Sequence, residues 1–281
     1  KTPAYFMNQA HGFNGVHGRM PAIATGANAA NRELSYIGVS GDGDSLSIGL
    51  GQLCHAIRRN VDLLYLIENN GVYGLTKGQF SASADVGTKT KKGDVNRHEP
   101  IDPVLLGLSL GASFVARGFS GDKAQLVPIL KAGLTHKGFA LVDIISPCVT
   151  FNDHEASTKS YVYTREHASP VVFADLIPPK GEITTDYEPG TKQNVRLHDG
   201  SVVRLRKVAD DYDPTDRDRV YAYVRERQEV GEVVTGLLYV SPESPEMHDL
   251  LGTVDEPLVG LPFETLCPGA AALEKLQAEY R

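Results

Sequence analysis

The sequence predicts an α/β protein in which helices flank a parallel sheet. Short apolar runs alternate with helix-length segments between about residues 34 and 146. The run at residues 61–67 is continuous enough for a strand that is covered on both faces. Polar motifs follow these runs at residues 41–44, 69–79 and 146–153. Ligands of parallel sheets bind at the carboxyl ends of strands, so these motifs are the expected site.

The first elements are a strand at residues 34–40 and a helix at residues 45–59. The strand ends in a Gly-Asp-Gly-Asp turn, and the helix has apolar side chains spaced three and four apart, at Leu46, Leu50, Leu53, Cys54 and Ile57. Asp102-Pro103 predicts the start of the next helix, because an N-cap residue precedes proline at the first helical position. Residues 113–116, 122–136 and 139–145 then continue as strand, helix and strand.

The composition changes beyond residue 170, where prolines and isolated strand signals such as residues 202–205 become frequent. Asp213-Pro214 opens a predicted helix that runs to about Glu229, and residues 233–240 form another apolar run. We therefore expect an α/β domain over residues 1–170 and an extended C-terminal arm over residues 171–281. This arm is expected to pack on the core or on a partner subunit.

The composition also excludes some classes of protein. The net charge of −7 and the single short basic cluster at residues 89–92 argue against a nucleic-acid partner. No apolar stretch approaches the roughly 20 residues that span a bilayer, and no signal-peptide pattern is present, so we expect a cytoplasmic protein without a membrane partner. Three cysteines cannot build a disulfide framework, and reduced thiols and a shared metal site both stay open. Lys1 opens the chain without methionine, and we expect further sequence upstream.

The strongest local signal is Gly41-Asp42-Gly43-Asp44 after one strand and Asn70 at the end of the next. A helix between parallel strands returns the chain to the same sheet edge, so these residues are expected to lie side by side. Magnesium prefers hard oxygen ligands and keeps phosphates and water in its other positions. Glycines allow phosphates to approach the backbone, and the following helix N-terminus favours their charge. The alternative is an ordinary turn.

These residues resemble the thiamine-diphosphate motif, and the chain is similar to the β subunit of 2-oxoacid:ferredoxin oxidoreductases. The most specific match is the run at residues 70–79, Asn-Gly-Val-Tyr-Gly-Leu-Thr-Lys-Gly-Gln. Further matches lie at residues 17–19, 24–26 and 58–62. A looser match at residues 212–216 and 235–239 resembles the two-subunit type that includes 2-oxoglutarate enzymes.

The resemblance implies that Asp42, the Asn70 side chain and the Val72 carbonyl bind magnesium. It also implies that thiamine diphosphate lies against a second group of residues, made up of Gly41, Asp42, Gly43, Asp44, Asn70, Val72, Gly74, Leu75 and the His17-Gly18 segment. The alternative for His17 is a surface or packing histidine.

Lys77, with Leu75 and Thr76 beside it, is implied to bind a substrate carboxylate, which suits a dicarboxylic 2-oxoacid. The alternative is an exposed loop lysine. Lys1 occupies the place of a second lysine of this kind. Cys148 is implied to be one of four thiolates that hold a [4Fe–4S] cluster. The other three are expected upstream of Lys1. The alternative for Cys148 is a buried structural thiol.

The activity implied is oxidative decarboxylation of a 2-oxoacid, with 2-oxoglutarate expected first. Coenzyme A takes the acyl group, and electrons pass through the cluster to ferredoxin. The family's α subunit supplies the glutamate that activates the cofactor, so a heterodimer is expected. Two alternatives stay open, a thiamine-diphosphate-dependent non-redox lyase and a non-catalytic scaffold subunit. Replacement of Asp42 by alanine distinguishes the enzymes from the scaffold.

Overall fold

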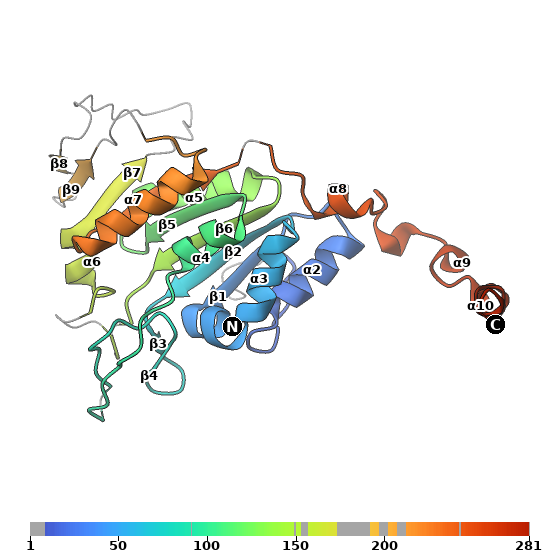
Figure 1. The fold of residues 1–281 in the computed structure, drawn as a ribbon, viewed down its shortest axis with the longest axis horizontal. Coiled ribbons are helices and arrows are strands. Elements are labelled where there is room, and N and C mark those ends of the chain that lie inside the picture. Colours follow the sequence, from blue (N-terminus) through green and yellow to red (C-terminus); the bar gives the residue numbers. More distant parts are fainter. Residues whose placement is uncertain are drawn as a thin grey trace.

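The structure is a computed structural model that describes residues 9–90, 92–148, 150–152, 157–172, 192–196, 202–206, 212–241 and 243–280 (Figure 1). Lys1 lies outside these residues, so its predicted role stays a prediction. The α/β prediction is confirmed, because a mostly parallel sheet lies between helices.

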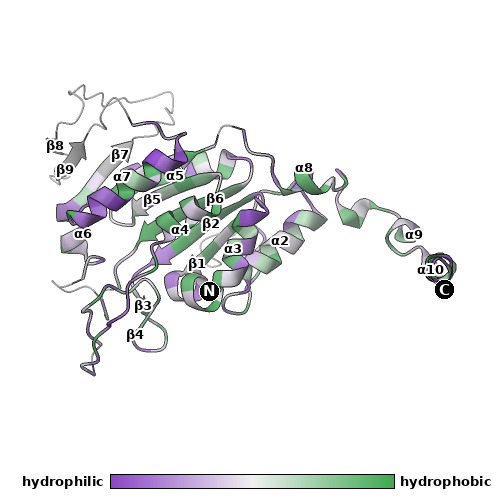
Figure 2. Cartoon of the chain, in the orientation of Figure 1, coloured by the Kyte–Doolittle hydropathy of each residue, from purple (hydrophilic) through white to green (hydrophobic). Residues whose placement is uncertain are grey.

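Six strands form the central sheet of the described residues. In spatial order they are β1 (Ile37–Gly41), β2 (Leu63–Asn69), β6 (Phe139–Ile145), β5 (Phe114–Phe119), β10 (Val233–Val240) and β7 (Ala168–Val172). The first four run parallel, whereas β10 is antiparallel to β5 and parallel to β7. All seven residues of β6 are buried, as expected for a central strand covered on both faces. Figure 2 shows that apolar residues are concentrated on these central strands.

Helices cover both faces of the sheet. The helices α2 (Met20–Ala30), α3 (Leu50–Arg58), α4 (Pro103–Leu110) and α7 (Arg217–Glu229) pack on one apolar core. Helix α5 (Lys123–Thr135) packs on a second core across the sheet, where Ile129 contacts Leu64, Phe114 and their neighbours. Asp102 caps α4 by accepting hydrogen bonds from the Val104 and Leu105 amides, which confirms the predicted helix start.

Two predicted helix boundaries are wrong. The helix expected over residues 45–59 is instead a π-helix, η1 (Gly43–Ile48), followed by α3. The two meet at Gly49, where a methyl group would lie 2.8 Å from the Gly18 backbone, so the close approach of another segment interrupts the regular helix. Helix α7 begins at Arg217 with Asp216 as its N-cap, because Asp213 forms a turn with Thr215 instead.

The last third of the chain is divided between the body and an extension. The 170/171 boundary falls inside β7, while β10 and α7 belong to the central sheet and its covering layer. Strands β8 (Lys192–Arg196) and β9 (Val202–Arg206) pair as a hairpin. Beyond β10, the short helices α8 (Met247–Leu251), η2 (Leu258–Gly260), α9 (Phe263–Leu266) and α10 (Gly269–Ala278) lead away from the body (Figure 1). None of the helices in the described ranges is both long and apolar enough to cross a membrane.

Candidate functional site

The two polar motifs, at residues 41–44 and 69–79, lie side by side at one edge of the sheet, as predicted. Strand β1 pairs in parallel with β2, and Gly41 lies opposite Glu68. Asp42 therefore leaves β1 beside the residues that leave β2. The Gly71 amide donates a hydrogen bond of 2.9 Å to Asp42 Oδ2, which joins the two motifs directly.

Asp42 is buried, with 1% of its surface exposed, and its hydrogen bonds are unevenly divided between its two oxygens. Oδ2 accepts from the Gly71 amide, from Ser81 Oγ at 2.5 Å and from Ser83 Oγ at 2.6 Å. Among the described residues no donor bonds Oδ1, and no Lys, Arg or His forms an ion pair with this carboxylate. A buried charge is costly unless it is paired, so this carboxylate is suited to bind a cation.

Asn70 and Val72 lie on either side of Gly71, whose amide bonds Asp42. The Val72 amide donates to Asn70 Oδ1 at 3.0 Å, away from the partner strand of its hairpin. This hairpin consists of β3 (Val72–Tyr73) and β4 (Gln79–Phe80). In extended backbone the carbonyl of a residue points to the same side as its amide, so the Val72 carbonyl also faces the Asn70 side. Carboxylate, amide and carbonyl oxygens are the donor set that magnesium prefers.

Asn152, which is not part of the recognised motif, holds the turn at Asn70. Asn152, which is fully buried, donates from Nδ2 to the Asn70 carbonyl at 2.8 Å. Its Oδ1 is buried and has no hydrogen-bond partner among the described residues. Asn152 is 82 positions from Asn70 in the chain, so only the folded structure brings the two together.

The glycines at the start of η1 have different surroundings. A methyl group at Gly41 would meet no described atom within 4 Å, so the space beside it is open for a ligand. A methyl group at Gly43 would lie 2.5 Å from Tyr73 Cε1, because the tyrosine ring packs on this residue. Tyr73 also donates its hydroxyl to the Gly43 carbonyl at 3.0 Å. Gly43 is therefore required for the packing of the β3–β4 hairpin, and Gly41 leaves room beside it.

Asp44 anchors the predicted His17-Gly18 segment. Its Oδ1 lies 2.8 Å from His17 Nδ1 and accepts the Gly18 amide at 2.8 Å, while Oδ2 accepts Ser40 Oγ at 2.5 Å. The His17 side chain is 72% exposed. Because a carboxylate repels phosphate oxygens, we assign Asp44 the task of holding this segment. Direct contact of Asp44 or His17 with a diphosphate stays a prediction.

Lys77, Leu75 and Gly74 lie on the loop that joins β3 to β4. Leu75 is 90% exposed and Lys77 is also exposed. Lys77 has a φ of 80°, an uncommon backbone conformation for a residue with a side chain. Such strain persists where the surrounding structure imposes it, and it is frequent at functional sites. The structure therefore places Lys77 on an exposed loop after Asn70, and its pairing with a substrate stays a prediction.

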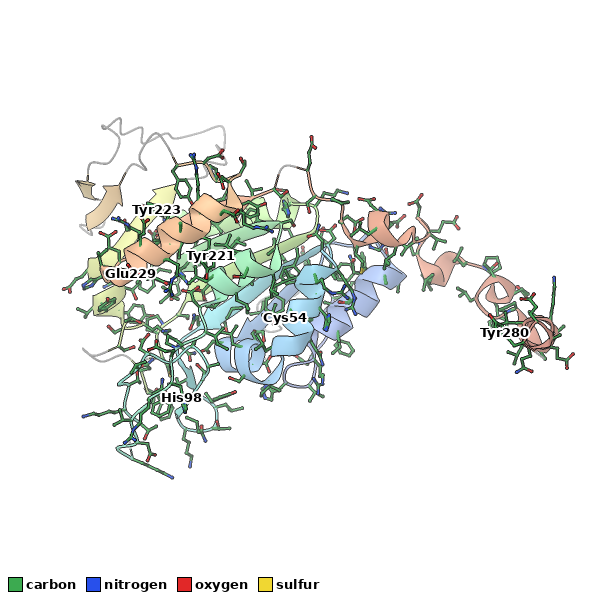
Figure 3. The ribbon with its side chains drawn as sticks, viewed as in Figure 1. Cys54, His98, Tyr221, Tyr223, Glu229 and Tyr280 are labelled. Carbon is green, nitrogen blue, oxygen red and sulfur yellow. The ribbon has the colours of Figure 1, made fainter. Side chains whose placement is uncertain are left out.

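Cys148 lies beside this loop. A methyl group at Gly74 would come within 3.8 Å of Cys148 Sγ, which places the half-buried thiol next to the proposed cofactor loop. Cys54 lies on α3 (Figure 3), where burial raises the pKa of its thiol, and Cys267 is exposed on the C-terminal extension. No group of three or more His, Cys, Asp or Glu side chains within the described ranges is arranged to hold a metal. The role of Cys148 in an iron–sulfur cluster stays a prediction.

A second charged cluster, which the sequence did not reveal, lies deeper in the sheet. Arg117 Nε donates to Asp143 Oδ2 at 2.7 Å, and Arg117 Nη2 donates to Asp102 Oδ2 at 2.6 Å. Burial lowers the pKa of Arg117, but the two carboxylates outweigh it and raise the pKa overall. Burial raises the pKa of Asp143. Burial alone would also raise the pKa of Asp102. The Arg117 guanidinium and the hydrogen bonds from the α4 amides outweigh burial there, so the pKa of Asp102 is lowered.

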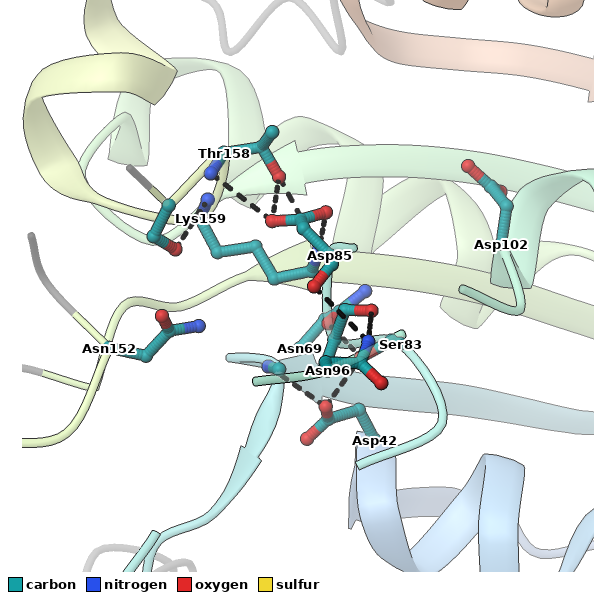
Figure 4. A network of polar contacts seen from close by, with 12 residues as sticks. Asp42, Asn69, Ser83, Asp85, Asn96, Asp102, Asn152, Thr158 and Lys159 are labelled. Carbon is teal, nitrogen blue, oxygen red and sulfur yellow. Dashed lines mark hydrogen bonds and ion pairs between the residues drawn. The ribbon is translucent and has the colours of Figure 1, made fainter. Parts of the chain in front are cut away.

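This cluster lines a cavity of about 560 Å³ that reaches Asn69 and Ser83 behind the metal motif. A further ion pair in its wall joins Lys159 Nζ to Asp85 Oδ1 at 3.0 Å, and Thr158 also donates to Asp85. Figure 4 shows Asp85, Thr158 and Lys159 as one group beside Asp42, Asn69 and Ser83. The chain supplies two cations for these three carboxylates, so each carboxylate has a cationic partner inside the protein, which is typical of a structural cluster.

Comparison with known proteins identifies the same family. Residues 1–144 match the family model for the C-terminal TPP binding domain of thiamine pyrophosphate enzymes. The 2-oxoglutarate oxidoreductase subunit KorB of Mycobacterium tuberculosis is 42% identical over 172 residues, which is 59% of this chain and 46% of that protein. The 2-oxoacid:ferredoxin oxidoreductase subunit beta of Saccharolobus solfataricus is 44% identical over 162 residues, which is 57% of this chain and 52% of that one. The chain thus spans about half the length of these relatives.

A solved structure extends the similarity. The 2-oxoglutarate:ferredoxin oxidoreductase from Magnetococcus marinus, solved with 2-oxoglutarate, coenzyme A and succinyl-CoA bound, superposes with a TM-score of 0.64 at 29% identity. The match covers 89% of this chain and 72% of that one. Through residues 1–144, the chain belongs to the family described as the C-terminal TPP binding domain of thiamine pyrophosphate enzymes. It resembles the β subunits of 2-oxoacid:ferredoxin oxidoreductases.

Proposed function

We propose that this chain is the β subunit of a cytoplasmic 2-oxoacid:ferredoxin oxidoreductase that acts with an α subunit. The reaction is coenzyme-A-dependent oxidative decarboxylation, with 2-oxoglutarate converted to succinyl-CoA. Electrons pass through a [4Fe–4S] cluster, with Cys148 as one ligand, to ferredoxin. The substrate assignment is supported by relatives whose names specify 2-oxoglutarate.

The observation that carries the proposal is the Asp42 carboxylate, which is buried at the sheet edge without a cationic partner among the described residues. Asp42 Oδ1, the Asn70 side-chain oxygen and the Val72 carbonyl would hold a magnesium ion, and their chemistry fits that ion. The open space at Gly41 would accept the diphosphate. Bound thiamine diphosphate would supply the carbanion-stabilising chemistry of decarboxylation, and this chain would bind and orient it.

The direct test is turnover by the full-length protein together with its partner subunit. Reduction of an artificial electron acceptor is followed with 2-oxoglutarate, pyruvate and a branched-chain 2-oxoacid, each with and without coenzyme A. We expect coenzyme-A-dependent reduction that is strongest with 2-oxoglutarate. No reduction with any substrate, although thiamine diphosphate and the clusters are bound, would overturn the oxidoreductase assignment.

Lys77 tests the substrate class within the same assay. Replacing Lys77 by methionine removes the charge that would bind the distal carboxylate of 2-oxoglutarate. We expect the KM for 2-oxoglutarate to rise about ten-fold, or about 1.4 kcal/mol, with little change for pyruvate. Lys92→Met is the matched control, since Lys92 is also an exposed loop lysine and should leave both KM values unchanged. An equal rise for both substrates would contradict a specific carboxylate contact.

A further inference from the structure

The orientation of Asp42 depends on a segment outside the recognised motif. Ser81 and Ser83 follow β4 and lie 39 and 41 positions from Asp42 in the chain. Both serines are buried, and both donate their hydroxyl to Asp42 Oδ2. With the Gly71 amide, three donors meet on this one oxygen.

Three donors on one oxygen restrict rotation of the carboxylate about its Cβ–Cγ bond. The other oxygen, Oδ1, then keeps a single direction and stays available as a ligand. The two hydroxyls and the amide also offset part of the cost of burying the charge. Partners that orient a metal-binding side chain in this way contribute to affinity without touching the metal.

Ser83 is linked to the buried ion cluster, and Ser81 lies beside Ser83, with 3.1 Å between the two hydroxyl oxygens. The Ser83 hydroxyl lies 2.9 Å from Asn69 Oδ1, and it shares its single proton between this atom and the closer Asp42. Asn69 Nδ2 donates to Asp143 Oδ1 at 2.9 Å, which fixes the Asn69 oxygen toward Ser83. Because Asp143 is bonded to Arg117, hydrogen bonds link Asp42 to the core without a break. Figure 4 shows the end of this network at Asp42, Ser83 and Asn69.

We propose that Ser81 and Ser83 are positioning residues, which hold Asp42 so that Oδ1 faces the magnesium ion of the thiamine diphosphate site. The proposal rests on the proposed function, because it requires magnesium at Asp42. It assigns these residues no contact with the metal, the cofactor or the substrate.

The test is calorimetric titration of the full-length protein and its partner subunit with thiamine diphosphate at a series of magnesium concentrations. The variants are Ser81→Ala, Ser83→Ala, the double alanine variant and Ser83→Thr, which keeps a hydroxyl. The matched control is Ser113→Ala. Ser113 is also a buried serine, and its hydroxyl donates to Asn60 Oδ1 at 2.7 Å far from the motif. The Tm of every variant without magnesium measures folding separately.

We expect each single alanine variant to raise the apparent magnesium dissociation constant about ten-fold and the double variant about a hundred-fold. Ser83→Thr should restore binding to within about three-fold of the wild type. Ser113→Ala should lower the Tm without weakening magnesium binding. Wild-type magnesium affinity in the double variant would overturn this proposal alone. Loss of affinity in proportion to the Tm, in Ser113→Ala as in the others, would overturn it as well. Binding by the wild type that does not depend on magnesium would overturn the proposed function and this proposal together.

Discussion

Asp42 and Asp143 are both buried carboxylates of the same sheet, but they are compensated differently. Asp143 has none of its surface exposed and pairs with the Arg117 guanidinium, which also binds Asp102. Asp42 is 1% exposed and receives only neutral donors from the described residues. Asp143 lies within β6, whereas Asp42 lies just beyond the carboxyl end of β1, where ligands of such sheets bind.

The source of the compensating charge distinguishes the structural ion cluster at Asp143 from the proposed binding site at Asp42. In the Arg117 cluster, the chain itself supplies the cation that bonds both carboxylates. The Asp42 carboxylate has all its donors from the described residues on one oxygen, and under the proposed function its other oxygen binds a cation that arrives from solution. Burial and charge alone do not distinguish the two sites, but the source of the compensating charge does.

The largest expected effect comes from removing the cation of the complete cluster. Arg117→Met leaves Asp143 fully buried and Asp102 partly buried without their cation, and breaking a buried pair in this way costs about 3–5 kcal/mol. We expect the free energy of unfolding, measured by urea titration, to fall by about this amount. A fall below about 1 kcal/mol would show that the cluster is not compensated as described, since exposed ion pairs contribute no more than this.

A second variant addresses the binding carboxylate. Asp42→Asn keeps the shape of the side chain and removes the charge that attracts magnesium. We expect magnesium-dependent binding of thiamine diphosphate to weaken at least a hundred-fold, about 2.7 kcal/mol. The free energy of unfolding without magnesium should change by less than about 1 kcal/mol, because no ion pair is broken.

Asp143→Asn is the paired control for that variant. It disturbs the cluster around Arg117 and reaches Asp42 only through Asn69 and Ser83. We therefore expect a larger loss of stability and a smaller loss of magnesium affinity than in Asp42→Asn. The comparison between the two clusters fails if both asparagine variants reduce stability equally and leave magnesium binding intact.

The smallest expected effect is a pH dependence at Asp102. The pKa of this carboxyl is lowered from its usual 3.8, chiefly because Arg117 opposes the effect of burial. Its charged form therefore stabilises the fold above pH 3.8, and this stabilisation is lost as the pH falls through the folded-state pKa. Asp102→Asn keeps a good N-cap, so the variant isolates the charge. We expect it to lower the free energy of unfolding by about 2 kcal/mol at pH 7 and by progressively less below pH 4. A difference that stays constant from pH 7 to pH 2 would contradict the assignment.

The parts of the fold that were predictable from sequence are those with local causes. The apolar runs at Phe139–Ile145 and Val233–Val240 coincide with β6, which is buried throughout, and with β10, which is partly buried. Asp102-Pro103 marks the start of α4, because both the cap and the proline act within one helical turn. The helix predicted at residues 45–59 failed for a non-local reason, the approach of Gly18 to Gly49.

For the site, too, only the part with a simple structural cause was predictable from the sequence. The motif placed Asp42 and Asn70 together, because parallel strands impose that meeting. Ser81 and Ser83 were not predicted, and Asn152 lies within the predicted polar segment 146–153 but was given no role of its own. Serines and a lone asparagine carry no spacing signal, and their partners lie 39 to 82 positions away. The insertion of β10 beside β5 likewise depends on long-range pairing, which its apolar run does not specify.

The central claim is that Asp42 belongs to a metal site and not to a structural turn. Its most direct test is a crystal structure of the full-length protein and its partner subunit with thiamine diphosphate and manganese, an anomalous scatterer that accepts the oxygen ligands of magnesium. We predict an anomalous peak bonded to Asp42 Oδ1, the Asn70 side-chain oxygen and the Val72 carbonyl, with Ser81 and Ser83 still on Asp42 Oδ2. A bound cofactor whose metal lies away from Asp42 would contradict the claim.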